Sequence, residues 1–213
     1  MNEAQIKEMI LRVCDAEINS KDKLCRLDSF VGDGDHGYTV EGGFQTVKKE
    51  IAEKKYNSVK SVFQDTGDIL ADSMGGAIGM IIGALFTGGA CELDDKPEID
   101  EKGFSIFFSS GLEEIKMVGG AEEGDRTLVD ALSPAVSAFK TAQEEGKKLT
   151  ECFQAAAKAA KAGAESTKGM MAKKGRAKFL QEKSLGYIDA GSVTMAIIIE
   201  TMKEYAEYLE ATA

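Results

Sequence analysis

Residues 73–91 have the sequence SMGGAIGMIIGALFTGGAC, and this stretch decides between a membrane protein and a water-soluble helical one. It carries no charged residue and is long enough to cross a bilayer as a helix. Six of its residues are glycine, and Gly75, Gly79 and Gly83 recur every four residues, which leaves one face of a helix without side chains. Because nothing else in the sequence resembles a membrane protein, we expect a buried helix pressed against a neighbour or a ligand.

The sequence on either side of this stretch predicts an all-α fold. The 213 residues include only two prolines, and apolar residues recur at intervals of three and four. We therefore expect one domain, residues 1–213, with a bundle of about eight helices. The expected helices are residues 3–19, 42–55, 59–72, 73–91, 104–117, 127–145, 150–172 and 192–209.

Composition excludes several classes of function. The chain has 26 basic and 36 acidic side chains, and a formal charge of −10 disfavours direct binding to nucleic acid or to an anionic membrane. The first twenty residues lack the apolar core of a secretion signal, so we expect a cytoplasmic protein. Four scattered cysteines without a CxxC pair, with His36 as the single histidine, do not make a zinc site and indicate reduced thiols. Carboxylates must therefore carry most of the chemistry.

An acidic loop follows the first predicted helix. Residues 28–37, DSFVGDGDHG, place three aspartates and three glycines within ten positions. Carboxylates this close repel one another unless a divalent cation or protons neutralise them, and glycines let the backbone turn several oxygens inward. A hard metal ion fits Asp28, Asp33 and Asp35. The alternative is an ordinary surface turn, because Asp and Gly also favour turns.

Two familiar metal motifs fit this loop poorly. An EF-hand loop that starts at Asp28 would have Phe30 at its third position, where a ligand is required. A loop that starts at Asp33 would have Phe44 at its twelfth position, where a glutamate is required. The haloacid dehalogenase-like phosphatases use an Asp-x-Asp after a strand, which Asp33 and Asp35 imitate, and later acidic residues, which Asp125 and Asp130 imitate. That phosphatase is the best competing enzyme, but it needs alternating strands and helices where this sequence predicts helices.

Three other segments have features that suit phosphate binding. Residues 74–79 open a helix with small residues, so free backbone N–H groups could meet a phosphate, although close helix packing explains them equally well. Residues 119–127 form a glycine-rich loop that either caps a helix or serves a ligand. Residues 168–183 hold six basic side chains opposed only by Glu182, which suits a phosphate, an acidic partner surface or a solvated loop. Arg176 is the member best suited to a bidentate phosphate contact.

Taken together, these motifs resemble the nucleotide-binding L subunit of dihydroxyacetone kinase over nearly the whole chain. The resemblance implies a closed barrel of eight antiparallel helices with the nucleotide, ADP or ATP, in the loops at one end. It also implies two Mg²⁺ ions on Asp28, Asp33 and Asp35, and no catalytic side chain beyond these ligands. In chain order the motifs are Leu27-Asp28 with residues 32–37 (GDGDHG), 75–77 (GGA), 119–121 (GGA) with 124–132 (GDRTLVDAL), 175–177 (GRA) and 189–191 (DAG).

The resemblance also implies a set of nucleotide contacts, and the chain departs from the family at three of them. Ile78 stands where the family has serine, Thr39 near a family asparagine, and Ala190 where the family has proline. Ile78 has no hydroxyl, and the lost hydrogen bond to a phosphate costs about 1–3 kcal/mol. We expect a divergent branch that acts on a related short ketose or aldose. The implied contacts are His36, Gly37, Tyr38, Thr39, Ala77, Ile78, Gly119, Leu128, Arg176, Asp189, Ala190 and Gly191.

The family's activity depends on partner proteins. A K subunit holds the sugar covalently on a histidine, and 213 residues leave no room for that unit as well. The chain thus resembles the subunit of the phosphotransferase-system-dependent enzymes, in which bound ADP is rephosphorylated by a phosphohistidine M subunit. The non-enzyme alternative is a nucleotide-sensing regulatory module, because relatives bind transcription regulators. A transcription regulator as a further partner and a homodimer both stay open.

Overall fold

The computed structural model describes residues 1–212, and these residues contain nine α-helices, two 3₁₀ segments and no β-strand. The all-α prediction is confirmed. The 3₁₀ segments are η1 (Thr167–Gly169) and η2 (Arg176–Ser184). The helices are α1 (Glu3–Asn19), α2 (Lys21–Asp28), α3 (His36–Ala52), α4 (Val59–Ser73), α5 (Gly76–Cys91), α6 (Glu101–Gly119), α7 (Val129–Glu144), α8 (Leu149–Ser166) and α9 (Ala190–Thr212).

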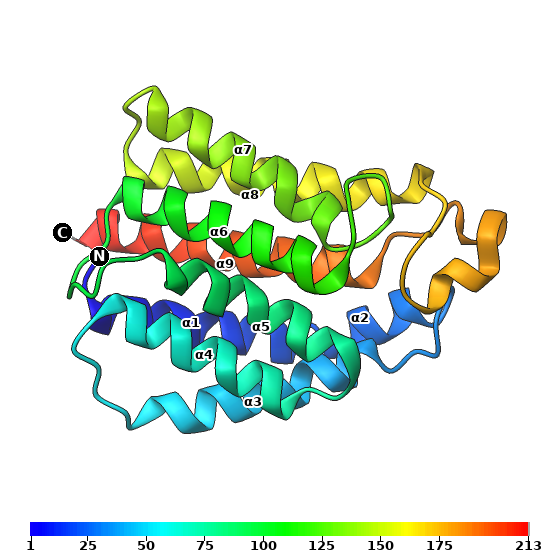
Figure 1. Cartoon of the computed structure of the whole chain (residues 1–213), viewed down its shortest axis with the longest axis horizontal. Helices are drawn as coiled ribbons and strands as arrows, with labels where there is room; N and C mark the ends of the chain where they lie inside the picture. Colours follow the sequence, from blue (N-terminus) through cyan, green and yellow to red (C-terminus); the bar gives the residue numbers. More distant parts are fainter. Residues whose placement is uncertain (213) are drawn as a thin grey trace.

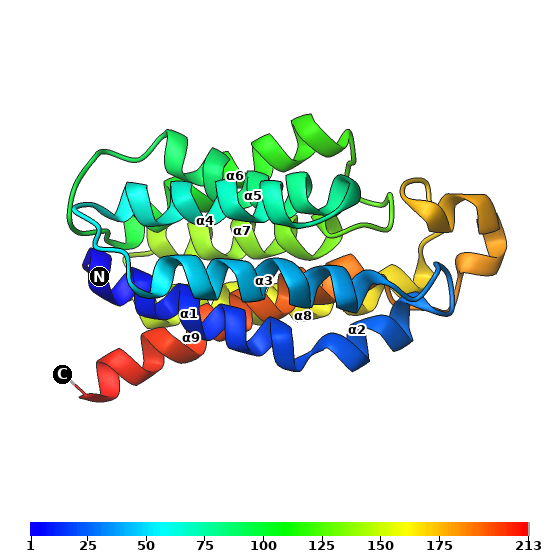
Figure 2. The same ribbon diagram turned by 90° about the horizontal axis from the view of Figure 1, so that it is seen from below.

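Eight of these helices close into a ring (Figure 1). Each helix packs against the next in the order α1, α3, α4, α5, α6, α7, α8 and α9, and α9 packs against α1. Neighbouring helices of the ring run in opposite directions, as Figures 1 and 2 show. The short α2 lies against α3 and α9 and is the ninth helix. The ring therefore accounts for the eight predicted helices, and α2 is an additional helix that was not predicted.

Several predicted boundaries were wrong for identifiable reasons. α3 begins at His36 rather than at residue 42, because Gly37 lets its first turn lie against α2, where a Cβ atom would be 2.1 Å from the Lys21 carbonyl oxygen. α8 ends at Ser166 rather than at residue 172. The buried Thr167 turns the chain there, because its hydroxyl donates to the Ala164 carbonyl at 2.6 Å and accepts from the Asp189 N–H at 2.9 Å. The segment predicted as a loop after residue 173 contains η2.

Phenylalanine side chains fill part of the interior of the ring. Phe63 of α4 stacks on Phe107 of α6 with ring centroids 4.1 Å apart, and Phe139 and Phe153 of α7 and α8 meet edge to face at 5.2 Å. Each buried phenylalanine contributes roughly 1.5–3 kcal/mol, so this cluster is a main source of stability. The buried members are Phe63, Phe86, Phe104, Phe107, Phe108, Phe139 and Phe153.

Residues 76–91 of the uncharged stretch form α5, a helix packed between α4 and α6. A Cβ atom on Gly83 would lie 2.7 Å from the carbonyl oxygen of Gly67 in α4, and one on Gly79 would lie 2.8 Å from that of Leu70. Gly75 has open space around it and precedes the helix. Within residues 1–212, no helix combines the length and the apolar character that crossing a membrane requires. The prediction of a buried helix is confirmed.

Candidate functional site

Four connections between helices lie at the same end of the ring, because successive helices alternate in direction (Figures 1 and 2). They are the acidic loop before α3, the turn between α4 and α5, the loop between α6 and α7, and the long connection between α8 and α9. These are the segments that carry the motifs found in the sequence. The topology therefore gathers at one end residues that are up to about 160 positions apart, such as His36 and Thr194, whose side chains meet 2.9 Å apart.

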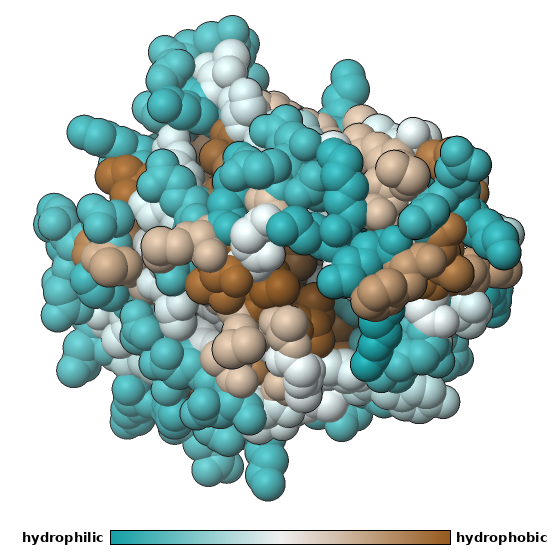
Figure 3. All heavy atoms as spheres, turned by 45° about the vertical axis from the view of Figure 1, so that its right-hand side comes forward, coloured by the Kyte–Doolittle hydropathy of each residue, from teal (hydrophilic) through white to brown (hydrophobic). Residues whose placement is uncertain are grey.

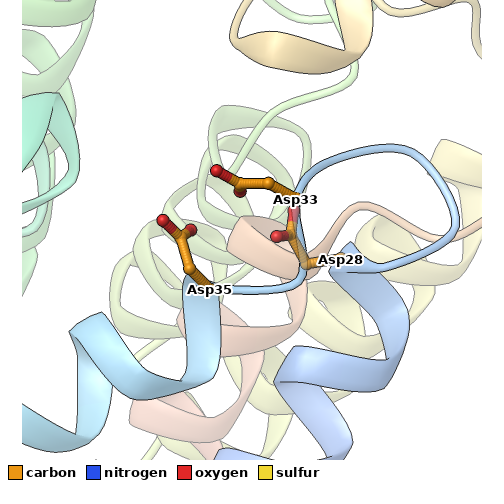
Figure 4. A group of neighbouring side chains, drawn as sticks. All are labelled: Asp28, Asp33 and Asp35. Atoms are coloured by element: carbon orange, nitrogen blue, oxygen red, sulfur yellow. The ribbon is translucent and has the colours of Figure 1, made fainter.

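The acidic loop forms the predicted carboxylate cluster. Asp28, Asp33 and Asp35 each offer a carboxylate oxygen, and these atoms all lie within 4.8 Å of one another (Figure 4). Gly34 has a φ of +76°, and its N–H donates to the Asp28 Oδ2 atom at 2.8 Å, which holds that carboxylate in place. Gly32 leaves room for it, because a Cβ atom there would be 2.3 Å from the Asp28 Oδ1 atom. Three convergent oxygen donors suit a hard divalent cation such as Mg²⁺.

Arg176 closes over this cluster. Its Nη1 atom donates to the Asp35 Oδ1 atom at 3.0 Å and also pairs with the Asp33 carboxylate. The hydrogen bond to Asp35 and the charges of both aspartates raise the pKa of Arg176. Gly175, with a φ of +62°, makes the turn that starts η2 and brings Arg176 to the cluster. The predicted phosphate ligand and the predicted metal ligands thus lie in direct contact.

Arg176 belongs to a projecting segment, residues 173–187, which we call the flap. Lys173 anchors its beginning, because its N–H donates to the Asp125 carbonyl at 3.1 Å and its ammonium donates to the Asp125 carboxylate at 3.0 Å. At the end of the flap, Tyr187 stacks on Phe30 of the acidic loop with ring centroids 5.0 Å apart. Asp125 of the α6–α7 loop and Phe30 therefore fix the two ends of the flap to two other parts of the site.

Arg126 is a buried residue at this end of the ring, and no role was predicted for it from the sequence. Its side chain is fully buried, and its Nη2 atom donates to the Tyr187 carbonyl at 2.9 Å. The Nη1 atom lies 3.9 Å from the Asp189 Oδ1 atom, and within the described residues Nε and Nη1 have no hydrogen-bond partner. Burial lowers the pKa of Arg126. The sequence signal that could have identified Arg126 is its place in the motif GDRTL, just before a helix with many apolar residues. A charged side chain is rarely buried there unless it has a structural or functional role.

Three predicted contacts lie together at the start of α9. The Asp189 Oδ2 atom accepts a hydrogen bond from the Ser192 N–H at 2.7 Å, which caps the helix. Burial raises the pKa of Asp189 to about 6, although one-fifth of its side chain remains exposed. A Cβ atom on Gly191 would lie 3.1 Å from the Asp189 carboxylate and 3.8 Å from the Leu128 side chain. Ala190 is buried in the first turn of the same helix.

The first turn of α3 contributes four predicted contacts that face different surroundings. The His36 Nε2 atom lies 2.9 Å from the Thr194 hydroxyl, and burial lowers the pKa of His36, which favours the neutral ring. Gly37 faces α2 rather than the open end. Tyr38 is 64% exposed. The Thr39 N–H donates to the Asp35 carbonyl at 3.1 Å, so Thr39 continues the helix from the acidic loop.

The remaining predicted contacts belong to α5 and α6. Ala77 is exposed and Ile78 half-buried in the first turn of α5, while Gly119 is the last residue of α6, with the Ile81 side chain 3.6 Å from its Cβ position. No hydrogen bond in the described residues joins them directly to the aspartates. Figure 3 brings this end forward and shows apolar side chains gathered in a hollow among hydrophilic ones.

The phosphatase alternative has no architectural basis in this fold. Residues 1–212 contain no strand, and Asp33 and Asp35 lie between two helices. The later acidic residue Asp130 is already engaged, because its two carboxylate oxygens accept hydrogen bonds from the N–H groups of Gly124 at 2.5 Å and Thr127 at 2.7 Å. These bonds shape the loop before α7 and give Asp130 a structural role.

Comparison with known proteins connects this geometry to a family. Residues 30–204 match the family model of the DAK2 domain. The chain is 34% identical over 190 residues to the ADP-binding subunit DhaL of PEP-dependent dihydroxyacetone kinase 2 from Listeria innocua, covering 86% of this chain and 88% of that protein. It is 28% identical to the corresponding subunit from Escherichia coli, covering 95% and 96% of the two chains.

Longer kinases also contain a similar region. The L-erythrulose kinase of Pectobacterium atrosepticum is 34% identical over 182 residues, which are 84% of this chain and 31% of that protein. The crystal structure of the dihydroxyacetone kinase from C. freundii in complex with AMP-PNP and Mg²⁺ superposes with a TM-score of 0.73 at 29% identity, covering 96% of this chain and 34% of that one. With a helical ring, a carboxylate cluster and these relatives, the chain belongs to the DAK2 domain family, whose matched members are subunits and domains of dihydroxyacetone kinases and related kinases.

Proposed function

We propose that this chain is the ADP- and ATP-binding phosphotransfer subunit of a dihydroxyacetone kinase complex. The observation that carries the proposal is the carboxylate cluster of Asp28, Asp33 and Asp35, whose oxygens lie within 4.8 Å of one another at the end of the ring where the other motifs also lie. The similarity to ADP-binding subunits over 86–95% of this chain, and the Mg²⁺ and AMP-PNP named for the C. freundii kinase, support the same assignment.

Asp28, Asp33 and Asp35 would hold magnesium, and we propose two ions. Their donor set consists of carboxylate oxygens, which are the ligands that Mg²⁺ prefers. Magnesium bound there supplies neutralisation of the negative charge on the nucleotide phosphates. The role of these side chains is therefore to fix cations, and none of them acts as a base or a nucleophile.

The chain's other residues bind and orient the nucleotide. The N–H groups of Ala77 and Ile78 belong to the first turn of α5, where backbone donors lack helical partners and favour an anion. Arg176 would contact phosphate through its guanidinium, which matches phosphate oxygens in geometry. The exposed apolar side chains of Met80 and Met117, near the ends of α5 and α6, offer a surface for a base. The other proposed contacts are His36, Gly37, Tyr38, Thr39, Gly119, Leu128, Asp189, Ala190 and Gly191.

The proposed reaction passes one phosphoryl group through the nucleotide. A phosphohistidine on an M subunit would transfer its phosphoryl group to bound ADP and regenerate free histidine and ATP. The γ-phosphoryl group of ATP would then move to a hydroxyl of a short ketose held on a K subunit, which releases the hydroxyl proton and returns ADP. We propose that both partners act with this chain in the cytoplasm, where its four cysteines, free in this structure, would stay reduced.

The sugar is dihydroxyacetone or a related short ketose. The 34% identity to an L-erythrulose kinase supports a four-carbon ketose as a second candidate. Ile78 contributes no hydroxyl in the first turn of α5, so its backbone N–H would be the group that binds phosphate there. Supplying the chain with cognate K and M subunits and comparing the two ketoses as acceptors distinguishes these substrates.

The metal cluster is tested by Asp33→Ala. We expect this variant to lose Mg²⁺-dependent ADP binding, measured by isothermal titration calorimetry with and without Mg²⁺, because a cation would lose one of three carboxylates. Asp94→Ala is the matched control, because Asp94 is an exposed aspartate in the α5–α6 connection at the opposite end of the ring. Unchanged Mg²⁺-dependent binding in Asp33→Ala would remove the proposed site.

A further inference from the structure

In the tip of the flap, residues 174–183, a single side chain makes the hydrogen bonds and ion pairs to the rest of the described protein. Among residues 1–212, the hydrogen bonds and ion pairs that join this tip to anything outside the flap come from Arg176 alone. The base is fixed more firmly, because Lys173 pairs with Asp125 and the Tyr187 carbonyl accepts from Arg126. The position of the tip therefore depends on the contact of Arg176 with Asp33 and Asp35.

That contact uses the same carboxylates as the proposed metal site. The Arg176 Nη1 atom bonds to Oδ1 of Asp35 and to Oδ1 of Asp33, and a guanidinium supplies there the positive charge that two adjacent carboxylates require. A cation bound by Asp33 and Asp35 would need these oxygens and would repel the guanidinium. Arginine and metal therefore compete for one pair of ligands.

We propose that Arg176 is a latch that holds the flap on the acidic cluster in the absence of metal, and that a divalent cation releases it. The proposal rests on the proposed function, because it requires Asp33 and Asp35 to bind the cation. The same guanidinium has two roles. Before metal binds it neutralises the carboxylates, and after metal binds it is free to contact a phosphate. The apparent association constant for metal is the intrinsic constant multiplied by the fraction of molecules in which Arg176 is not bound to the aspartates, so the latch lowers it.

The latch predicts that removing Arg176, a proposed phosphate ligand, strengthens metal binding. We expect Arg176→Ala to bind Mn²⁺ roughly two- to thirtyfold more tightly than the wild type in the absence of nucleotide, which is the range for two exposed ion pairs. Mn²⁺ takes the same oxygen ligands as Mg²⁺, and its free concentration is measured by electron paramagnetic resonance. Lys178→Ala is the matched control, because it removes one positive charge from the same tip without a contact to the aspartates.

A second measurement follows the flap itself. Phe179 in the tip is 79% exposed and is a cleavage site for chymotrypsin that both variants keep. We expect Mn²⁺ to speed cleavage at Phe179 in the wild type, and we expect Arg176→Ala to be cleaved at that higher rate with or without Mn²⁺. Circular dichroism spectra of the variants confirm that the helices are kept.

The outcomes separate the latch from the metal site. Tighter Mn²⁺ binding in Arg176→Ala than in Lys178→Ala supports the latch, together with cleavage that depends on Mn²⁺ in the wild type and in Lys178→Ala but not in Arg176→Ala. Equal affinities of the two variants overturn it, because the effect of Arg176 would then be general charge alone. If neither variant nor the wild type binds Mn²⁺, and Asp33→Ala changes nothing, the metal site of the proposed function fails and the latch fails with it.

Discussion

Glu17 of α1 is a fully buried carboxylic acid, and both of its oxygens lack a hydrogen-bond partner within the described residues. Burial raises the pKa of Glu17 well above its ordinary range, so the folded protein keeps this proton at a pH where the unfolded chain has lost it. The free energy of unfolding therefore falls as the pH rises above the unfolded pKa toward the folded one. Glu17 makes the fold more stable in mildly acidic than in alkaline solution.

Glu17→Gln removes this dependence, because glutamine does not ionise. We expect the free energy of unfolding of the variant, relative to the wild type, to increase steadily from pH 5 to pH 8 in urea titrations followed by circular dichroism. Glu8→Gln, on the exposed face of the same helix, is the control. Its free energy of unfolding relative to the wild type should change far less between pH 5 and pH 8. Parallel curves for Glu17→Gln and the wild type would show that Glu17 is ionised in the fold.

For single residues, the sequence was most informative where the residue type alone indicates a chemical role. Three aspartates among glycines predicted a cation site, and the structure brings Asp28, Asp33 and Asp35 together. The contact of Arg176 with that cluster was not predicted, because it joins residues about 140 positions apart through the course of the flap. Arg126 was missed for a related reason, since its burial depends on Tyr187 and Asp189, which reach it from another connection.

The contact between α4 and α5 depends on glycine. A Cβ atom on Gly83 would be 2.7 Å from the Gly67 carbonyl oxygen, a distance that real Cβ atoms do not adopt, so Gly83→Ala must push the two helices apart. We expect this substitution to destabilise the protein by about 1–3 kcal/mol, measured by urea unfolding. The start of α5 would move with it, so we also expect weaker ADP binding.

Gly42→Ala is the matched control for this prediction. Gly42 lies within α3 and would have nothing within 4 Å of its Cβ atom, so alanine there gains helix propensity without a clash. It should be neutral or stabilise by about 0.4–1 kcal/mol. Equal effects of Gly42→Ala and Gly83→Ala would contradict the close approach of α4 and α5.

Helix boundaries were predicted best where an apolar stripe runs from one polar cap to the end of the helix. The bounds of α1 and α4 were within one residue of the prediction, because apolar stripes and polar caps coincide there. α2 was missed, since its eight residues include a single buried side chain, Leu24, and so have hardly any apolar stripe. The 3₁₀ segment η2 was missed because an exposed basic segment carries no periodic signal at all.

The ring as a whole was predicted only through the family resemblance. Periodicity indicates about eight helices but does not say that α9 packs against α1, because that contact joins the two ends of the sequence. What the sequence does hold is a series of helices that run in alternating directions, and alternation alone places every second connection at one end. The gathering of the motifs follows from this simple rule of direction.

A ligand at that end should stabilise the entire ring. The proposed site draws on the connections before α3, α5, α7 and α9, so ADP with Mg²⁺ would bind elements from every part of the fold. At ligand concentrations of about one hundred times Kd we expect about 2.7 kcal/mol of added stability and a melting temperature higher by roughly 5–10 °C, in one calorimetric transition. A similar rise with ADP and a chelator, without Mg²⁺, would contradict the role of the metal.

The positions of Met1 and Thr212 have a practical consequence. The terminal ammonium donates to the Ile99 carbonyl at 2.6 Å beside the α5–α6 connection, and the end of α9 lies on the same side, opposite the flap (Figure 1). α9, with 23 residues, spans roughly 34 Å between these two faces. A tether or dye coupled at Met1 or Thr212 therefore leaves the flap and the carboxylates unobstructed, and protein immobilised through either residue keeps the proposed nucleotide site open to solvent.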